Sequence, residues 1–384
     1  MQINRTLSDK IQNGVKNMPV TAILGARQVG KTTLAKIILR KYDNVKYLDL
    51  EKSTDLELMQ HPEQYFNLNK NVFLYCIDEI QLKPNLFSAL RSYVDENSKV
   101  RFLVLGSASP ALLRQSAETL AGRIFYYELN PFSYLEIKGH KTQEQYHLLG
   151  GFPKSILSDT SFAFEWLQNF VKTFLERDLQ MFGYTIPPLI LRRLWIMLAH
   201  LNGQLSNYAS LSRAMGIDEK TVKKYIDILH NTYMLRVLQP YYVNVKKRLV
   251  KAPKIYLRDT GILHSLLGIT SYENLYTNPI YGSSWEGLVI ENIISKFPDW
   301  EPYFYKTTVG AEIDLILVKG VEVIAIEIKA SITPKLNKGF WIARKDIKAT
   351  KAFIIAPVKE TYVYKDDVFV YNLEAFLKLD INIL

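Results

Sequence analysis

At residues 19–33 the chain reads PVTAILGARQVGKTT, and this stretch decides the fold of the first part of the protein. The apolar run at residues 20–24 has the length and β-branched character of a buried parallel strand. Residues 25–32 then fit the phosphate-binding loop pattern G-x-x-x-x-G-K-T. Apolar side chains at helical spacing follow at residues 33–41. The stretch therefore predicts a strand, a phosphate-binding loop and a helix in succession, which is the context that the motif requires.

The residue types of this loop indicate what it would bind. Gly25 and Gly30 permit backbone turns that a Cβ would block, so the N–H groups of the loop can point at an anion. Lys31 would place a positive charge on the outer phosphates, and the hydroxyl of Thr32 would reach a Mg²⁺ ion. Thr33 opens the helix and belongs to the same binding set. We therefore expect this loop to bind ATP with Mg²⁺.

Length and composition limit the kind of protein. A chain of 384 residues is long for one core, so two or three domains are expected. No run approaches the roughly 18 apolar residues of a membrane span, the start lacks the apolar core of a signal peptide, and the single cysteine, Cys76, excludes an internal disulfide. These features predict a cytoplasmic protein without membrane contact. The net charge of +10 points weakly to nucleic acid, and a merely lysine-rich surface explains it equally well.

An α/β pattern fills the first domain, about residues 1–140. Further strands are predicted at residues 45–50, 72–79, 100–107 and 124–129. Ligands of such sheets bind at the carboxyl ends of the strands, where Asp78, Glu79 and Ser107 fall. Asp78 would hold Mg²⁺ through water, and Glu79 would accept a proton from an attacking water as a general base.

A phosphate-binding loop followed by Asp78-Glu79 at the end of an apolar strand resembles the AAA-type P-loop ATPases with an additional strand. The resemblance implies that Ser107, in Leu-Gly-Ser-Ala-Ser, is the polar sensor between the water and the γ-phosphate. It also implies that Arg123, at the end of an Ala-Gly-Arg stretch, supplies an arginine finger or sensor, in cis or from a neighbouring subunit. The alternative for Arg123 is a surface arginine in a loop. Arg27, inside the loop, faces either solvent or a phosphate.

The middle region, about residues 141–270, is predicted to be mainly helical. Two helices at residues 208–215 and 219–233 are joined by a short turn, and residues 234–243 and 254–257 can pair as a β wing. This pattern is typical of a winged helix-turn-helix, whose second helix could enter a major groove.

Basic residues gather on the second of these helices and on the wing. They are Lys220, Lys223, Lys224, Lys246, Lys247 and Arg248. Charge and fold therefore both predict contact with DNA. The alternatives are a winged helix that binds protein or is purely structural, and a lysine face that is only solvated. No set of base-reading residues can be identified.

The last domain, about residues 280–384, carries a second pattern of charged residues. Glu286 lies on a predicted helix, Asp314 on a predicted strand, and Glu327 and Lys329 on the next strand as Glu-x-Lys. This order resembles the PD-(D/E)xK nuclease fold, which is the α/β restriction-endonuclease-like fold. The three acids would bind a divalent metal through hard oxygens, and Lys329 would position or activate the attacking water.

Two further acids are alternative ligands in this region: Glu291 on the same helix as Glu286, and Glu312 on the strand of Asp314. The region as a whole resembles the uncharacterised domain that commonly follows this ATPase type in bacteria and archaea. Activity does not follow from the fold, because such a site can bind a metal without cutting.

The predicted fold class is therefore α/β, with an N-terminal P-loop ATPase built on a parallel sheet, a middle winged helix-turn-helix region and a C-terminal restriction-endonuclease-like domain. These modules favour an ATP-dependent nucleic-acid enzyme, in which hydrolysis changes the domain arrangement and the last domain cuts or grips a phosphodiester. The alternative is an ATP-gated switch or scaffold that binds a protein partner and carries an inactive nuclease-like domain. A small-molecule kinase is disfavoured, because it explains neither the Asp78-Glu79 pair nor the last domain. The sequence leaves open whether the chain forms a homo-oligomer.

Overall fold

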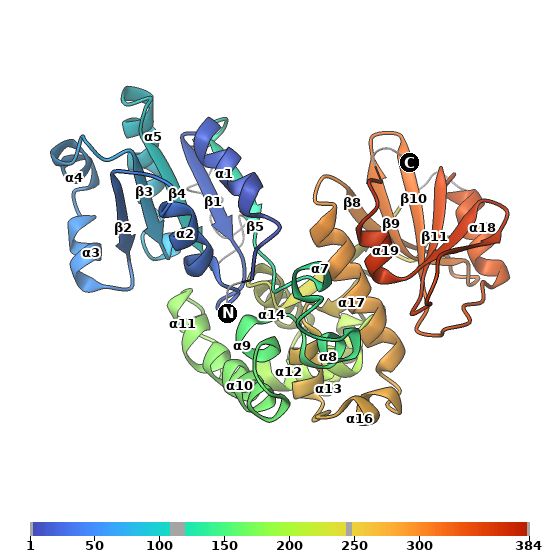
Figure 1. Cartoon of the computed structure of the whole chain (residues 1–384). Coiled ribbons are helices and arrows are strands. Elements are labelled where there is room, and N and C mark those ends of the chain that lie inside the picture. Colours follow the sequence, from blue (N-terminus) through green and yellow to red (C-terminus); the bar gives the residue numbers. More distant parts are fainter. Residues whose placement is uncertain (1–2, 108–119, 243–247, 382–384) are drawn as a thin grey trace.

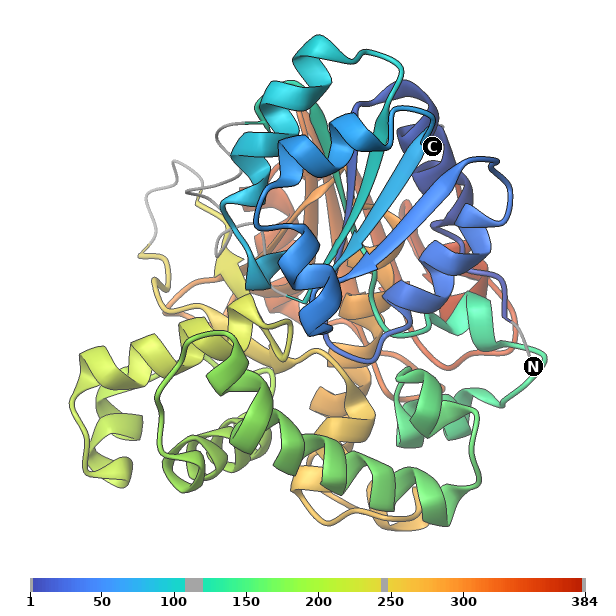
Figure 2. The ribbon, with the colours of Figure 1, turned by 90° about the vertical axis from the view of Figure 1, so that its left-hand side faces the viewer.

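The computed structural model describes residues 3–107, 120–242 and 248–381. Two β-sheets lie on opposite sides of the molecule, and a group of helices lies beneath and between them (Figure 1). After a quarter turn the first sheet stands in front of the second, and the helices lie below both (Figure 2). The chain thus passes from the first sheet through the helices to the second sheet.

The first sheet is parallel and has the strand order β2-β3-β4-β1-β5. Its strands are β1 (Val20–Leu24), β2 (Val45–Asp49), β3 (Leu74–Asp78), β4 (Arg101–Gly106) and β5 (Ile124–Glu128). β1 and β3 are buried along their whole length, as expected for strands covered on both faces. The predicted parallel sheet is confirmed, and β4 is the additional strand, because it separates β1 from β3.

Helices cover this first sheet. They are α1 (Ser8–Asn17), α2 (Lys31–Leu39), α3 (Ser53–Leu58), α4 (Pro62–Leu68) and α5 (Leu86–Glu96). α3 and α4 are separate helices, because Pro62 cannot continue α3 and instead takes the first position of α4. A 3₁₀ turn, η1 (Ile80–Leu82), follows β3.

The middle of the chain is mainly helical, as expected. Its helices are α7 (Tyr134–Ile137), α8 (Gln143–Leu149), α9 (Pro153–Ile156), α10 (Thr160–Thr173), α11 (Leu179–Met181), α12 (Pro188–His200), α13 (Tyr208–Met215), α14 (Glu219–Asn231), α15 (Thr260–Leu266) and α16 (Tyr272–Tyr276). A π-helical turn, η3 (Phe174–Asp178), joins α10 to α11. The side chain of Asp218 caps α14 by accepting the N–H of Thr221 at 2.9 Å.

The second sheet has the order β12-β13-β11-β10-β9-β8-β6-β7. Its strands are β6 (Leu235–Pro240), β7 (Lys254–Leu257), β8 (Glu301–Lys306), β9 (Glu312–Lys319), β10 (Glu322–Ile328), β11 (Lys351–Ile355), β12 (Tyr362–Lys365) and β13 (Val368–Tyr371), and its helices are α17 (Tyr281–Lys296), α18 (Lys338–Asp346) and α19 (Leu373–Leu377). β6 and β7 are antiparallel, and β6 also pairs with β8 at Gln239 and Tyr303. The strand pair expected as a wing is therefore continuous with the sheet of the last domain.

Ser284 lies inside α17 and is fully buried. Its hydroxyl lies 2.9 Å from Nε2 of His147 and 2.8 Å from Nε2 of His264. Burial lowers the pKa of His264 to about 4, so that imidazole stays neutral in the folded protein at pH 7. The hydroxyl thus joins α17 to α8 and α15 instead of capping a helix.

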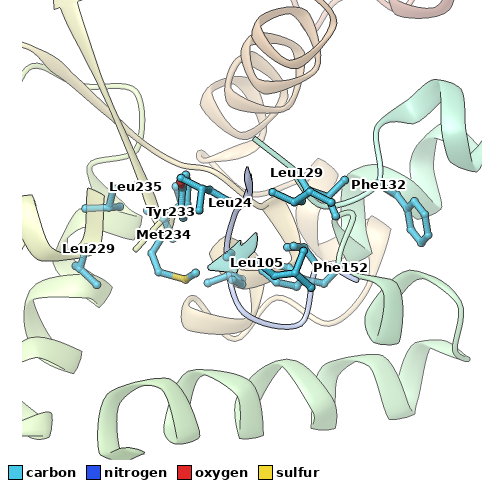
Figure 3. Packing of buried hydrophobic residues seen from close by; sticks show 14 of the residues in the cluster. Leu24, Leu105, Leu129, Phe132, Phe152, Leu229, Tyr233, Met234 and Leu235 are labelled. Carbon is cyan, nitrogen blue, oxygen red and sulfur yellow. The ribbon is translucent and has the colours of Figure 1, made fainter. Parts of the chain in front are cut away.

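One apolar core runs through the first and middle parts and into the last. Figure 3 shows Leu24 and Leu105, at the ends of β1 and β4, close to Tyr233 and Met234, which follow α14. The carboxyl edge of the first sheet is therefore packed against the middle region and not exposed to solvent on that side.

A largely buried group of charges joins the three parts at the same place, with Glu128 at its exposed end. Arg258, which follows β7, pairs with Glu128 at the end of β5 and donates to Asn130 at 2.6 Å. It also pairs with Glu291 of α17 at 2.9 Å, and Arg236 of β6 pairs with Glu291 at 2.6 Å. Burial alone would raise the pKa of Glu291, but the two arginines outweigh it and hold that pKa at about 2.

The contact between α8 and α15 gives a testable prediction at Gly261. A Cβ there would lie 2.2 Å from the carbonyl oxygen of Leu149, a backbone atom that cannot rotate away. Gly261→Ala should therefore destabilise the protein by about 1–3 kcal/mol, which lowers the thermal unfolding midpoint by about 2–4 °C per kcal/mol. The matched control is Gly282→Ala in α17, where a Cβ meets nothing within 4 Å, and alanine should be neutral or stabilising by up to about 1 kcal/mol. Equal midpoints for the two variants in differential scanning fluorimetry would contradict this account of the contact.

Candidate functional site

The phosphate-binding loop connects the end of β1 to the start of α2. A Cβ on Gly25 would lie 2.2 Å from the carbonyl oxygen of Leu129, so only glycine fits there. Gly30 precedes α2 with a φ of 96°, a conformation that favours glycine. α2 begins at Lys31, two residues earlier than expected, so its free N–H groups lie at the loop. The strand, loop and helix of the motif are all present.

Lys31 is buried within this loop. Its Nζ donates to the carbonyl oxygens of Gly25 at 3.0 Å and Ala26 at 2.8 Å, and to the hydroxyl of Ser107 at 2.9 Å. Burial is the main cause that lowers the pKa of Lys31 to about 8. All three acceptors are neutral, so no carboxylate in hydrogen-bonding contact neutralises this ammonium, and it remains available to an anion.

Thr32 and Asp78 bring two oxygen donors together. The hydroxyl of Thr32 donates to Oδ2 of Asp78 at 2.7 Å, and the hydroxyl of Tyr47 on β2 donates to the same oxygen at 2.7 Å. Burial and this hydrogen bond raise the pKa of Tyr47, so it stays protonated. A hydroxyl and a carboxylate at the start of α2 are hard ligands of the kind that Mg²⁺ takes. The donor set therefore fits that ion.

Glu79 and Ser107 meet at the ends of β3 and β4. Glu79 has a φ of 54°, which is uncommon for a residue other than glycine and often marks functional sites. The hydroxyl of Ser107 lies 3.3 Å from Oε1 of Glu79, and the amide of Gln81 donates to the other carboxylate oxygen. The carbonyl of Gln81 accepts the N–H of Ser107 at 3.3 Å. Together with Lys31, these side chains form one hydrogen-bonded group.

Arg27 is in neither of the two environments left open by the sequence. Its guanidinium pairs with Glu51, after β2, and with Asp178, the last residue of η3. The Arg27 side chain is 13% exposed, and that of Asp178 is 3% exposed. The phosphate-binding loop is thus tied directly to the helices of the middle region.

Arg123 does not reach the loop of its own chain. It immediately precedes β5, whose first residue, Ile124, lies beside Val20 at the start of β1, whereas the loop follows Leu24 at the other end. Four residues of strand, about 13 Å, separate these two edges of the sheet. Arg123 instead pairs with Asp95 at 2.6 Å on the surface. The structure therefore contradicts a role in cis, and a role toward a neighbouring subunit stays a prediction.

A pocket of about 360 Å³ opens beside the loop. Its walls include Gly30 and Thr33 from the loop and α2, Ile3 from the start of the chain, and Phe132 and Pro153 from the segments after β5. The lining is largely apolar and adjoins the phosphate-binding residues. Such a pocket can take a planar base whose phosphates lie on the loop.

The residues of the second predicted site lie in the second sheet and on α17. Oδ2 of Asp314, on β9, accepts the N–H of Ile328 at 2.9 Å. Lys329 pairs with Glu327 at 2.6 Å. Burial, followed by the negative charge of Asp314, raises the pKa of both Glu286 and Glu327. The structure thus brings these acids within electrostatic reach of one another.

Lys254, from β7, lies inside this acidic group. Its Nζ is 2.9 Å from Oε1 of Glu312, 3.2 Å from Oε1 of Glu286 and 3.8 Å from Oδ1 of Asp314. Within residues 3–107, 120–242 and 248–381, no three His, Cys, Asp or Glu side chains are gathered closely enough to hold a metal ion. The prediction that Glu286, Asp314 and Glu327 form a metal site is therefore corrected: the donor set does not fit the ion, because a lysine lies among the acids.

The alternative ligands are also paired with basic side chains. Glu291 binds Arg236 and Arg258 in the group that joins the three parts, away from Lys254. Glu312 binds Lys254 and, at 2.6 Å, Lys306.

The basic residues of the middle region lie at the surface where the structure describes them. Lys220, Lys223 and Lys224 are exposed on α14, whose opposite face is buried through Val222 and other apolar residues. Arg248, in the segment between β6 and β7, is also exposed. Lys246 and Lys247 lie outside the described residues.

Three residues with polar roles were not assigned from the sequence. Tyr47 and Gln81 gave no signal: Tyr47 donates to Asp78 on another strand, and Gln81 contacts Ser107 as well as the nearby Glu79. Lys254 did give one: it is the only charged residue of the strand Lys-Ile-Tyr-Leu, all of which is buried. A lysine in such a strand requires carboxylate partners, and this could have been used.

Comparison with known families divides the chain into three consecutive matches. Residues 17–138 match the AAA domain, residues 140–273 match a domain of unknown function (DUF8612), and residues 281–376 match another domain of unknown function (DUF4143). Within the described part of the chain, no helix combines the length and apolarity needed to cross a membrane.

Comparison with solved structures finds a Walker-type ATPase of Pyrococcus abyssi, with 14% identity and a TM-score of 0.47 over 69% of this chain and 96% of that one. It also finds AMPPCP-bound DnaA from Aquifex aeolicus, with 16% identity and a TM-score of 0.33 over 59% of this chain and 88% of that one.

Curated relatives extend over nearly the whole chain. The uncharacterized protein Rv2008c of Mycobacterium tuberculosis is 34% identical over 366 residues, which cover 95% of this chain and 82% of that protein. An uncharacterized protein of Haemophilus influenzae is 22% identical over 351 residues, covering 82% of this chain and 83% of that protein. The chain therefore belongs to the family of the mycobacterial protein, and its first part matches the AAA domain.

Proposed function

We propose that this protein hydrolyses ATP and uses the cycle to control DNA binding by its middle region. The observation that carries the ATPase proposal is the single hydrogen-bonded group that joins Lys31, Ser107 and Glu79, next to the Thr32 and Asp78 pair. These residues come from three different segments, and they meet only at the carboxyl edge of the first sheet. A loop that merely held a nucleotide would need neither Glu79 nor Ser107.

Each residue has a role that its position supports. Lys31 would hold the outer phosphates, and Thr32 and Asp78 would hold Mg²⁺, which neutralises charge on those phosphates when it is bound. Glu79 would accept the proton of the attacking water, and Ser107 would orient that water or the γ-phosphate. Gln81 and Tyr47 are positioning residues, because they act through Glu79 and Asp78. Arg123 would contribute only to the site of a neighbouring copy.

Two ionic contacts would connect this site to the middle region. Arg27 joins the loop to Asp178 in η3, and Arg258 joins Glu128 at the end of β5 to the elements beyond α14. Occupation of the loop by phosphates would compete with Glu51 and Asp178 for Arg27. Binding or hydrolysis of the nucleotide would therefore first alter the contact between Arg27 and η3.

The middle region supports the DNA-binding part of the proposal. α12, α13 and α14 followed by the β6-β7 pair have the order of a winged helix-turn-helix. α13 and α14 form the helix-turn-helix, and three exposed lysines lie on its second helix, α14. A short lysine-rich helix next to further basic residues suits the phosphates of a duplex.

A second candidate function is an ATP-gated scaffold for a protein partner, with a nuclease-like last domain that does not cut. The position of Lys254 among Glu286, Glu312 and Asp314 favours the inactive form of that domain. Cleavage of DNA is accordingly not part of the function that we propose.

The ATPase proposal predicts different defects for two variants. Lys31→Ala should abolish both nucleotide binding and turnover. Glu79→Gln should retain ATP binding but lower turnover by about 10²–10⁴-fold, which is the usual contribution of a general base. Lys41→Ala is the matched control, because its ammonium contacts only Gln12 on the surface. Phosphate release and binding of a fluorescent ATP analogue measure the two effects, and normal turnover in both variants would refute the site.

The DNA-binding proposal predicts a defect that depends on position. Replacing Lys220, Lys223 and Lys224 with alanine should weaken binding to a duplex, and the slope of log K against log salt should fall by about one for each phosphate that these lysines neutralise. The control removes the same charge by replacing Lys335, Lys338 and Lys345, which are exposed in and beside α18. Fluorescence anisotropy at several salt concentrations makes the comparison. Equal effects of both triple variants would indicate non-specific attraction, and binding that is weak and independent of salt would favour the scaffold.

A further inference from the structure

The acidic group of the last domain already contains a cation supplied by the chain. We propose that the ammonium of Lys254 takes the place of a divalent metal ion in this group, so that the native protein binds no metal there. This inference concerns the second sheet and does not depend on ATP hydrolysis.

The contacts of Lys254 support this assignment. Two carboxylates, Glu286 and Glu312, lie within hydrogen-bonding distance of Nζ, and Asp314 lies within ion-pair distance. The ring of Phe304 lies 5.6 Å from Nζ and adds a cation–π contact. The Lys254 side chain is only 5% exposed. A buried ammonium is stable only with partners of this kind, and here each carboxylate is one that would otherwise favour a metal.

Further contacts engage oxygen atoms of the group, whereas Oε2 of Glu327 is buried without a hydrogen-bond partner. Oδ2 of Asp314 accepts the N–H of Ile328, the hydroxyl of Tyr256 donates to Glu286, and Oε1 of Glu327 accepts from Lys329. Ligation of Mg²⁺ or Mn²⁺ requires oxygens to converge at about 2.0–2.2 Å from one point. An ion at that point would lie against the positive charge of Lys254, so the lysine and the ion exclude each other.

The backbone fixes Lys254 in this position. Lys254 lies opposite Leu238 of β6 on one side and forms a bridge with Leu205 on the other. It therefore enters the acidic group from the middle region, between β6 and the segment after α12. A long, flexible side chain on a loop could leave the group easily, but a fully buried side chain on a doubly paired strand cannot.

The experiment is a titration of the nucleotide-free full-length protein with Mn²⁺, in which free Mn²⁺ is followed by electron paramagnetic resonance. The wild type and Asp314→Asn should give the same binding curve, because the acidic group holds no metal. Lys254→Met, which has a similar length without the charge, should gain about one Mn²⁺ per chain, and Lys254→Met/Asp314→Asn should lose it again. Lys251→Met is the matched control, because Lys251 is exposed three residues away and should change nothing.

Thermal unfolding provides a second readout that does not require tight binding. Lys254→Met leaves three carboxylates facing one another, so its midpoint should fall and should then rise by several degrees in millimolar Mn²⁺. Mn²⁺ should shift the unfolding midpoints of the wild type and of Asp314→Asn by the same amount. Either a wild-type Mn²⁺ site that is lost in Asp314→Asn, or a folded Lys254→Met protein that gains no Mn²⁺, would overturn the proposal. The first of these outcomes is decisive even if Lys254→Met does not fold.

Discussion

The arrangement of the three parts depends on the buried guanidinium of Arg258. Its side chain is 6% exposed, and it contacts Glu128 at the end of the first sheet and Glu291 on the long helix of the last domain. Removing the buried partner Glu291 would leave charge on Arg258 less compensated, and breaking a buried pair typically costs about 3–5 kcal/mol. The nucleotide-binding sheet therefore cannot separate from α17 without exposing Arg258 to water or finding it new partners. These two ion pairs and the shared apolar core together hold the three parts in their relative positions.

This constraint lies at the edge of the sheet where a nucleotide would bind. Glu128 is beside Leu24, the last residue of β1, and Gly25 begins the phosphate-binding loop. From the same loop, Arg27 pairs with Asp178. Burial raises the pKa of Asp178, and the positive charge of Arg27 only partly offsets that effect. Besides the apolar core, two ionic connections to the rest of the molecule therefore lie close to the phosphate-binding loop. A change of charge at the loop would act on them directly, without a displacement of the whole sheet.

The sequence predicts what is local and misses what is distant. The strands of the first sheet and the group of Lys31, Asp78 and Glu79 follow from apolar runs that end in polar residues, because parallel strands bring their carboxyl ends to one edge. The resemblance of the ordered acids to a nuclease-like fold also placed Glu286 and Asp314 near each other, as the structure does. It could not show that Lys254, 32 residues before Glu286, lies between them, since that depends on the pairing of β7 with β6. The buried role of Ser284 could not be predicted either, because its histidine partners come from distant helices.

The phosphate-binding loop and the acidic group of the second sheet differ in how firmly each holds its lysine. Lys31 donates to two carbonyl oxygens and a hydroxyl, and an anionic phosphate would offer it a better partner than any of these. Lys254 is held by negative charges, and an incoming cation would offer it nothing in exchange. A ligand can therefore recruit the first lysine, but only a movement of β7 could withdraw the second. Carboxylates and a lysine thus occur in both sheets, but the first lysine is free to meet an anion and the second is held by the acids themselves.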